Sequence, residues 1–281
     1  MRNIICHLVW LSFVVLDFQS CNKDSVIPAY VYIPAITVGG TNAFGSFSSK
    51  ITDAWIYQGD SLQGAYQLPC HFPMRASGLI TLNIGPGIKI DGIAATRAEY
   101  PFYSDTTMVV NLIPGKTDTL YPVVHYFSYT KMAFDYNFDN GGFPSGIDVI
   151  SSPPEDVFEG HSSGKIHIPD TISLAYCFAN AYAIPPLTTA AFLEMNYKCD
   201  YPFTVGINGY VSSTGVTTPV DVETLNAQSP PQWNKIYIDL TPTLNQAQPD
   251  STTIYFYVSK SNLTDQPNIY LDNIKLLYIQ P

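Results

Sequence analysis

Carboxylates are the side chains of this chain that could do acid–base chemistry, and glutamates are few among them. The glutamates are Glu99, Glu155, Glu159, Glu194 and Glu223. Hydrolysis of a glycosidic bond needs two carboxyl groups held ~5–9.5 Å apart. Glu155 and Glu159 belong to an acidic loop that we interpret as solvated. Glu194 interrupts an apolar strand, and strand alternation allows it to face solvent, which we favour over a catalytic role.

Histidine and serine patterns that mark known catalytic or metal sites are missing from the sequence. The histidines after the N-terminal segment are His71, His125, His161 and His167, and none belongs to an H-E-x-x-H pattern. The sequence also lacks a G-x-S-x-G elbow, a phosphate-binding glycine loop and a C-x-x-C pair. We therefore expect a protein that is not an enzyme, and keep a hydrolase only as a third hypothesis.

Tyrosines that alternate with aliphatic residues indicate a different chemistry, the binding of a ligand against flat rings. Tyr237 lies between two isoleucines, and Tyr255 and Tyr257 alternate with apolar neighbours in the same way. Successive residues of a strand point to opposite faces. The sequence therefore predicts that Tyr237, Tyr255 and Tyr257 leave the core face and could bind a ligand. Packing beneath a loop is the alternative, and the more common outcome.

The elements that position these residues are expected to be short strands. The chain of 281 residues is 46% hydrophobic and 13% charged, with 20 Tyr, 22 Pro and 18 Gly. Tyrosine favours strands, and frequent Pro and Gly mark turns. The formal net charge of −10 and the lack of a basic stripe argue against nucleic acid as a partner. We predict an all-β protein with no membrane-spanning segment after Cys21.

The N-terminal segment has the features of a secretion signal that ends at a cysteine. Arg2 precedes an apolar run from Ile4 to Leu16, which is too short to span a bilayer. Ser20 precedes Cys21. This arrangement resembles a bacterial lipoprotein signal, with residues 1–20 removed, Cys21 lipidated and residues 21–25 acting as a tether. An ordinary secretory signal cleaved nearby is the alternative.

The region 26–127 reads as a small antiparallel β-sandwich. Segments that carry strand patterns end at turn signals, and no amphipathic helix separates them. Residues 63–69 (QGAYQLP), 78–84 (GLITLNI) and 109–115 (VVNLIPG) resemble PEGA-type and transthyretin-like repeats of secreted bacterial proteins. The resemblance implies a spacer or adhesion module.

The region 131–281 reads as a larger β-sandwich of the jelly-roll type. Residues 138–141 (FDNG), 193–198 (LEMNYK) and 270–276 (YLDNIKL) resemble the galactose-binding-like jelly roll of carbohydrate-binding modules. That resemblance implies a structural Ca²⁺ between the first and last strands, with Asp139 and Asp272 at the matching positions. The alternative is that Asp272 and Asn273 only shape a β-bulge.

The whole arrangement is similar to surface lipoproteins of Bacteroidota-type bacteria. The O-glycosylation pattern of that group, Asp followed by Ser or Thr and then an apolar residue or Thr, recurs along the chain. Its acceptors would be Ser25, Ser61, Thr106, Thr119, Thr171 and Ser251. The alternative is that these Asp-Ser and Asp-Thr pairs only start turns.

Cysteine spacing leaves one question open. Cys177 and Cys199 could form a disulfide between neighbouring strands, or both could be buried apolar residues.

Together these features predict a lipid-anchored, extracytoplasmic outer-membrane protein that faces the periplasm or the cell surface. We expect the jelly roll to recognise a glycan or an envelope protein without catalysis. The alternative is a structural subunit of an outer-membrane assembly. The oligomeric state, the ligand and the membrane face stay open.

Overall fold

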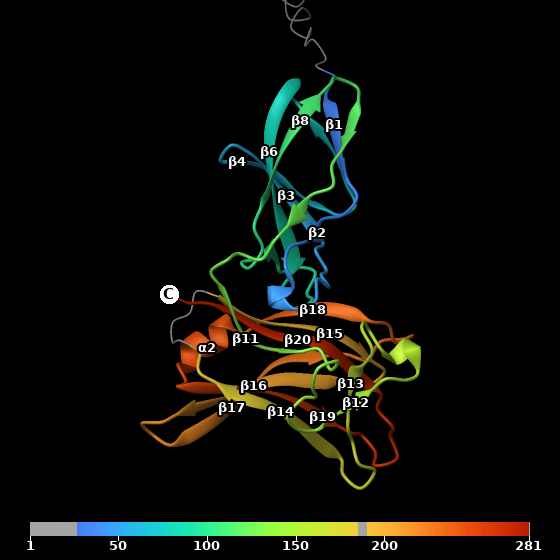
Figure 1. The fold of residues 1–281 in the computed structure, drawn as a ribbon, viewed down its shortest axis with the longest axis vertical. Helices are drawn as coiled ribbons and strands as arrows, with labels where there is room; N and C mark the ends of the chain where they lie inside the picture. Colours follow the sequence, from blue (N-terminus) through green and yellow to red (C-terminus); the bar gives the residue numbers. More distant parts are fainter. Residues whose placement is uncertain (1–26, 185–189, 281) are drawn as a thin grey trace, which may run out of the picture.

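The computed structural model describes residues 27–184 and 190–280, and within these ranges it is almost entirely strand and loop. The all-β fold class predicted from the sequence is confirmed. The strands form two units that lie one above the other along the long axis of the molecule (Figure 1). No helix in the described ranges has the length and apolar character that crossing a membrane requires. Cys21 and Ser25 lie outside the described residues.

The first unit contains β1 to β10. Their bounds are β1 (Ala29–Ile33), β2 (Thr37–Val38), η2 (Asn42–Phe44), β3 (Asp53–Gln58), β4 (Ser61–Gln67), β5 (Cys70–Met74), β6 (Gly78–Lys89), β7 (Arg97–Glu99), β8 (Thr106–Leu112), β9 (Thr117–Thr119) and β10 (Val123–Val124). One sheet has the order β4-β3-β6-β7, with β8 also paired to β6; the others are β5-β1-β9 and β10-β2. Alternation forms the core: in β1, Ala29, Val31 and Ile33 are buried while the tyrosines between them are half-buried.

The second unit is a sandwich of two sheets. Its elements are β11 (Thr130–Tyr136), β12 (Ile147–Ile150), η3 (Pro154–Asp156), β13 (Ser163–Ile166), β14 (Leu174–Tyr182), β15 (Ala190–Cys199), β16 (Phe203–Val211), β17 (Val216–Leu225), β18 (Asn234–Asp239), α2 (Thr241–Ala247), β19 (Ser251–Ser259) and β20 (Ile269–Ile279). One sheet has the order β12-β13-β20-β15-β18, with β11 also paired to β20. The other has the order β14-β19-β16-β17.

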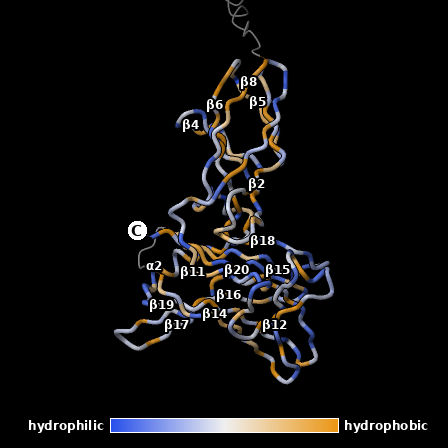
Figure 2. The backbone as a smooth tube through the Cα atoms, viewed as in Figure 1, coloured by the Kyte–Doolittle hydropathy of each residue, from blue (hydrophilic) through white to orange (hydrophobic). Residues whose placement is uncertain are grey.

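The facing sides of these two sheets enclose one apolar core. Leu193 of β15, Ile238 of β18 and Phe256 of β19 all belong to it and are inaccessible to solvent. Figure 2 shows apolar residues running along the strands, while many of the connecting loops are hydrophilic. Burial of these apolar side chains supplies the main stabilising free energy of the sandwich.

The outer face of the sheet that contains β15 and β20 is covered by the first unit. Phe192, Tyr237 and Leu277 point away from the sandwich core and pack into the core of the first unit. Strands β15 and β20 are consequently buried on both faces along most of their length. Among the residues that the structure describes, none covers the outer face of the other sheet in this way, and that face lies at the far end of the molecule (Figure 1).

Candidate functional site

Four aromatic side chains gather on the uncovered outer face of the β14-β19-β16-β17 sheet. Tyr176 and Phe178 come from β14, and Tyr255 and Tyr257 come from the neighbouring β19. The antiparallel register pairs Tyr176 with Tyr257 and Phe178 with Tyr255. Because paired residues share a face, all four rings project to the same side. We call these four residues the aromatic surface.

The rings of the aromatic surface form a connected patch. Tyr176 and Phe178 are stacked, with centroids 5.8 Å apart and an interplanar angle of 12°. Tyr176 lies 5.4 Å from Tyr257 and 6.1 Å from Tyr255. These separations are those of favourable aromatic pairs. Tyr176 is 45% exposed whereas Tyr255 is 3% exposed. Tyr176 therefore protrudes from the patch into solvent, whereas Tyr255 lies at the bottom of the patch.

Tyr255 lies across the sheet because β16 has a glycine beside it. A Cβ on Gly206 would come within 2.2 Å of Cζ of Tyr255. The Tyr255 hydroxyl passes this position and donates to Oδ1 of Asp221 on β17 at 2.5 Å. The Tyr257 hydroxyl donates to Oδ2 of the same carboxylate at 3.2 Å. Burial, followed by this bond to Asp221, raises the pKa of Tyr255. Asp221 thus fixes both rings.

The aromatic surface forms the wall and floor of a shallow depression of about 710 Å³. Its lining is completed by Leu174, Asn208, Pro219, Asp221 and Ser259. The depression therefore combines flat apolar rings with a few carboxylate, amide and hydroxyl groups. Such a combination suits a ligand that has apolar faces and hydrogen-bonding edges.

Tyr237 is not part of this surface, which corrects the expectation of a three-tyrosine platform. It is 1% exposed, and its hydroxyl accepts the backbone N–H of Lys50 in the first unit at 2.9 Å. Alternation correctly predicted that Tyr237 leaves the sandwich core. The first unit covers that face of β18, which no local pattern could indicate.

Tyr176, Phe178 and Asp221 were missed from the sequence. The first two had a usable signal, since Leu174, Tyr176 and Phe178 alternate with small residues in β14. No signal in the sequence indicated Asp221, because its contact with Tyr255 depends on the pairing of β17 with β16.

Glu194 lies in a buried charge cluster between the two units. Its carboxylate lies 2.8 Å from Nζ of Lys235 and accepts the hydroxyls of Tyr100 at 2.8 Å and Tyr126 at 2.9 Å. Burial opposes its ionisation, but Lys235 and then Lys275 outweigh burial and lower the pKa of Glu194. The side chain faces away from the sandwich core, as alternation allows, yet the first unit buries it completely. The expectation of a solvent-facing Glu194 is therefore wrong, and the group holds the two units together.

The two aspartates expected at a Ca²⁺ site lie near the joint between β13 and β20. Oδ1 of Asp139 accepts the backbone N–H groups of His161 and Ser162 at 2.7 and 2.9 Å. Asp272 is fully buried and accepts the hydroxyl of Ser163 at 2.6 Å. Asn273 adopts a left-handed φ of 48° where the pairing of β20 shifts register. These hydrogen bonds occupy some of the carboxylate oxygen lone pairs that would otherwise coordinate a cation. No group of three or more His, Cys, Asp or Glu side chains that could hold a metal ion gathers within the described residues, and the Ca²⁺ site stays a prediction.

Burial raises the pKa of Asp272 to about 7. The hydrogen bonds from Ser163 and Asn273 oppose this effect, while the charges of Glu159 and Asp139 add to it. The carboxyl group is therefore partly protonated near neutral pH, which removes some of the cost of burying its charge.

The predicted O-glycosylation acceptors other than Ser25 lie on both units. Ser61, Thr119 and Thr171 are exposed. Thr106 and Ser251 are half-buried, and the hydroxyl of Thr106 donates to the carbonyl of Val123.

Cys177 and Cys199 are buried free thiols. Their strands, β14 and β15, belong to opposite sheets, so the reading as apolar core residues holds. Burial raises the pKa of Cys177 to about 12 and that of Cys199 to about 11, which leaves both thiols unreactive near neutral pH.

No protein-family model matches the sequence, and no curated protein matches it. Similar solved structures include "Family 16 Carbohydrate Binding Module-2", at 16% identity and a TM-score of 0.35 over 52% of this chain and 99% of that chain. A structure on the promiscuous specificity of carbohydrate-binding modules from the β-sandwich superfamily is 11% identical, with a TM-score of 0.31 over 80% of this chain and 84% of that one. An exo-β-agarase is 12% identical, with a TM-score of 0.36 over 55% of this chain and 25% of the enzyme.

Proposed function

We propose that this protein is a glycan-binding protein and that the aromatic surface is its binding site. The observation that carries this proposal is the cluster of Tyr176, Phe178, Tyr255 and Tyr257 on an uncovered sheet face, with Asp221 at its edge. Tyr176 is 45% exposed within this patch of rings, and a contiguous exposed apolar patch is typical of a ligand-binding surface.

A sugar ring fits this arrangement chemically. One face of a pyranose presents C–H groups, which pack against an aromatic ring, while its rim presents hydroxyls. Asn208 and Ser259 border the rings and offer hydrogen-bonding groups to such hydroxyls.

Binding without chemical transformation accounts for the polar groups of the surface. The Asp221 carboxylate accepts two tyrosine hydroxyls, so its role is to orient rings. Glycoside hydrolysis needs a second carboxyl group across the scissile bond, and the lining of the depression includes no carboxylate besides Asp221.

The test is affinity for a panel of soluble polysaccharides, measured by calorimetry with the mature chain. Tyr176→Ala should weaken binding by about 2 kcal/mol, roughly thirtyfold in Kd, because an exposed central ring is lost. Tyr210→Ala is the matched control, since Tyr210 is 40% exposed on β16 of the same sheet but does not line the depression. Equal effects of the two substitutions, or no binding to any polysaccharide, would reject the proposal.

A structural subunit of an envelope assembly is the second candidate. Leu79, Val109 and Ile113 are 76%, 68% and 53% exposed, and the pairing of β6 with β8 makes them diagonal neighbours on one face. An exposed apolar stripe is typical of a protein contact. Failure to bind any polysaccharide, together with co-purification with a membrane complex, would favour this candidate.

We propose further that the protein is held outside the cytoplasm, at the outer membrane, by a lipid on Cys21. Several acyl chains would make this attachment stable. Metabolic labelling with an alkyne fatty acid should mark the wild type and not Cys21→Ala. Peptide mass spectrometry of the same material would show whether Ser61, Thr119 or Thr171 carries a glycan.

A further inference from the structure

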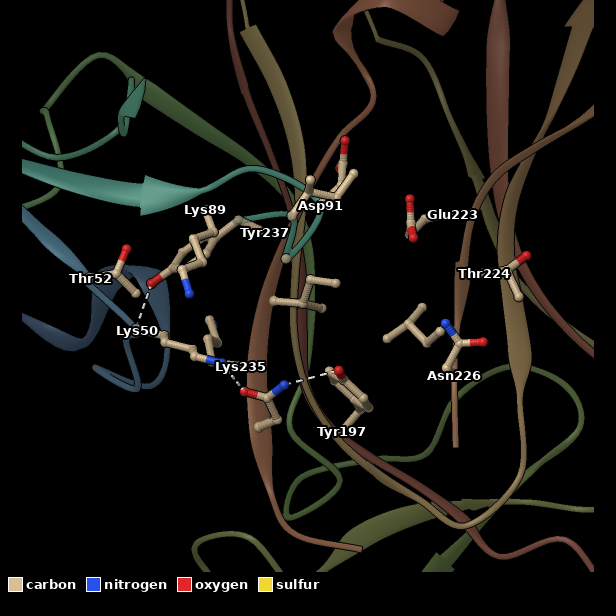
Figure 3. Close-up of a pocket in the computed structure, with 15 residues that line it drawn as sticks. Lys50, Thr52, Lys89, Asp91, Tyr197, Glu223, Thr224, Asn226, Lys235 and Tyr237 are labelled. Carbon is tan, nitrogen blue, oxygen red and sulfur yellow. Dashed lines mark hydrogen bonds between the residues drawn. The ribbon is translucent and has the colours of Figure 1, made fainter. Parts of the chain in front are cut away.

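A second cavity lies where the first unit meets the second (Figure 3), and none of its lining residues belongs to the aromatic surface. Its volume is about 340 Å³, at the small end of the range for small-molecule sites. The first unit contributes Lys50, Lys89 and Asp91, and the second contributes Glu223 and Asn234. Neither unit alone forms this cavity.

Hydrogen bonds between the two units hold one wall of the cavity in place. Ile90 forms an isolated parallel bridge with Tyr237 of β18. The N–H of Asp91 donates to the carbonyl of Tyr237 at 2.9 Å, and Oδ1 of Asp91 accepts the N–H of Asp239 at 2.9 Å. These bonds fix the turn after β6 against β18, so the cavity is organised before any ligand arrives.

One end of the cavity is cationic. Nζ of Lys50 donates to Oδ1 of Asn234 at 2.5 Å. Lys50 and Lys89 both line this end of the cavity, and burial and then the charge of Lys89 lower the pKa of Lys50. Within the described ranges, Lys89 has no hydrogen bond or ion pair from its ammonium group. A single anionic group placed between the two lysines would offset the repulsion between their charges.

The other wall carries carboxylates that the lysines do not neutralise. Burial raises the pKa of Asp91 and of Glu223, and the charge of Asp91 raises the pKa of Glu223 further. In Figure 3, Glu223 and Asn226 lie across the cavity from Lys50 and Lys89. Carboxylates in such a place accept hydrogen bonds from neutral hydroxyl donors. The hydroxyl of Tyr197 and the amide of Asn234 bond to each other along the remaining wall at 2.9 Å.

We propose that this cavity binds an acidic saccharide, a uronic acid or the end of a chain that carries one. The sugar carboxylate lies between Lys50 and Lys89, and its hydroxyls donate to Glu223 and Asp91. An inorganic phosphate dianion fits less well, because it brings more negative charge towards two carboxylates and has a single hydroxyl donor, whereas a uronate has several. The site is separate from the aromatic surface and does not depend on the function proposed for it.

The experiment titrates the mature protein with glucuronate and galacturonate by ligand-observed NMR and calorimetry. Glucose, inorganic phosphate and glycine serve as comparison ligands. We expect the uronates to bind and glucose to bind about tenfold more weakly or not at all, with affinity falling as salt increases. Preference for phosphate, for glycine or for glucose over the uronates would overturn the proposal.

Substitutions then locate the site. Lys50→Gln with Lys89→Gln should weaken uronate binding about tenfold or more and leave binding of a neutral polysaccharide unchanged. Lys116→Gln removes a single positive charge from an exposed residue of the first unit that does not line the cavity, and it should change neither the uronate affinity nor the polysaccharide affinity. Tyr176→Ala should leave uronate binding intact. Uronate affinity that the folded double variant retains, or that Tyr176→Ala removes, would place the ligand elsewhere and refute the proposal.

Discussion

Asp221 is a single carboxylate that sets the orientation of two rings. Tyr255 reaches it by lying flat over Gly206, and Tyr257 reaches its other oxygen. The hydroxyl of a buried tyrosine needs a partner, and here the partner is on β17, two strands away in the same sheet. The floor of the depression therefore depends on Tyr255, Gly206 and Asp221, which lie on three different strands. Only Tyr255 is aromatic.

Gly206→Ala should test this dependence on a small residue. The added Cβ would meet the Tyr255 ring at 2.2 Å, so the ring must lift away from the sheet and lose its bond to Asp221. We expect polysaccharide affinity to fall about tenfold, because the displaced ring fills the depression. Calorimetry measures the affinity, and circular dichroism monitors the fold.

Thr218→Ala is a suitable control, because Thr218 is exposed on β17 of the same sheet. Gly215→Ala is unsuitable, because Gly215 has a φ of 67° that an alanine rarely adopts. Unchanged affinity in Gly206→Ala would show that the ring position is unimportant.

At the scale of the element, β15 and β20 differ from ordinary sandwich strands because both of their faces are buried. One face packs on the sandwich core and the other on the first unit. Polar residues of these strands, such as Glu194 and Asp272, are consequently withdrawn from water and need partners within the protein.

Strand patterns predicted much of the fold and part of the candidate site. Alternation indicated the outward direction of Tyr255 and Tyr257, because direction is a local property of a strand. It could not indicate that Tyr237 is covered, since the covering residues come from a segment far away in the chain. The cavity between the units was unpredictable for the same reason: Lys50, Lys89 and Glu223 share no periodicity and meet only through the contact of the two units.

The bulge of β20 should make stability depend on pH. The pKa of Asp272 is about 7 in the folded protein and near 3.8 when unfolded. The folded state therefore binds the extra proton between these values, and this group's contribution to the free energy of unfolding decreases as pH rises from about 4 to about 7. Asp272→Asn removes this dependence, so the variant should gain stability relative to wild type, by up to a few kcal/mol, between pH 5 and pH 8. Urea denaturation at several pH values measures the difference, and a constant difference would contradict the raised pKa.

Calcium can be tested with the same pair of proteins. If the predicted ion binds at Asp139 and Asp272, adding Ca²⁺ at pH 8 should raise the melting temperature of wild type and not that of Asp272→Asn. Mg²⁺ at the same concentration controls for ionic strength. If Ca²⁺ does not change the melting temperature of the wild type, the predicted calcium site is wrong.

At the scale of the whole molecule, the two outer faces of the second unit differ in exposure. One face is covered by the first unit through apolar packing and the Glu194 charge cluster. The other presents the aromatic surface at the opposite end of the long axis (Figure 1). The arrangement holds the proposed ligand surface away from the first unit and from the end at which the chain enters it.

Glu194→Gln should loosen the contact between the units. The substitution leaves Lys235 and Lys275 buried without their carboxylate, at a cost of about 3–5 kcal/mol in unfolding free energy. The double variant Glu194→Gln with Lys235→Met should recover part of this loss, because it removes the uncompensated charge. Chemical denaturation measures both. A single variant as stable as wild type would show that the cluster does not hold the units together.

The pH response of this cluster has the opposite sign to that of Asp272. Because the pKa of Glu194 is lowered in the folded protein, its stabilising contribution is present above the ordinary carboxyl value and is lost as pH falls through the lowered one. The contact between the units should therefore persist at neutral pH and weaken only in strong acid.

The stacking of the two units along the long axis also determines how a pulling force would pass through the protein. If the chain is anchored beyond β1 and a fixed polymer is gripped at the far sheet, tension runs along the long axis and crosses the contact between Tyr100, Tyr126 and Glu194. Pulling there separates two packed surfaces broadside, so their bonds would share the force. If this contact separated while both units stayed folded, residues 127–130 would remain as the covalent link between them.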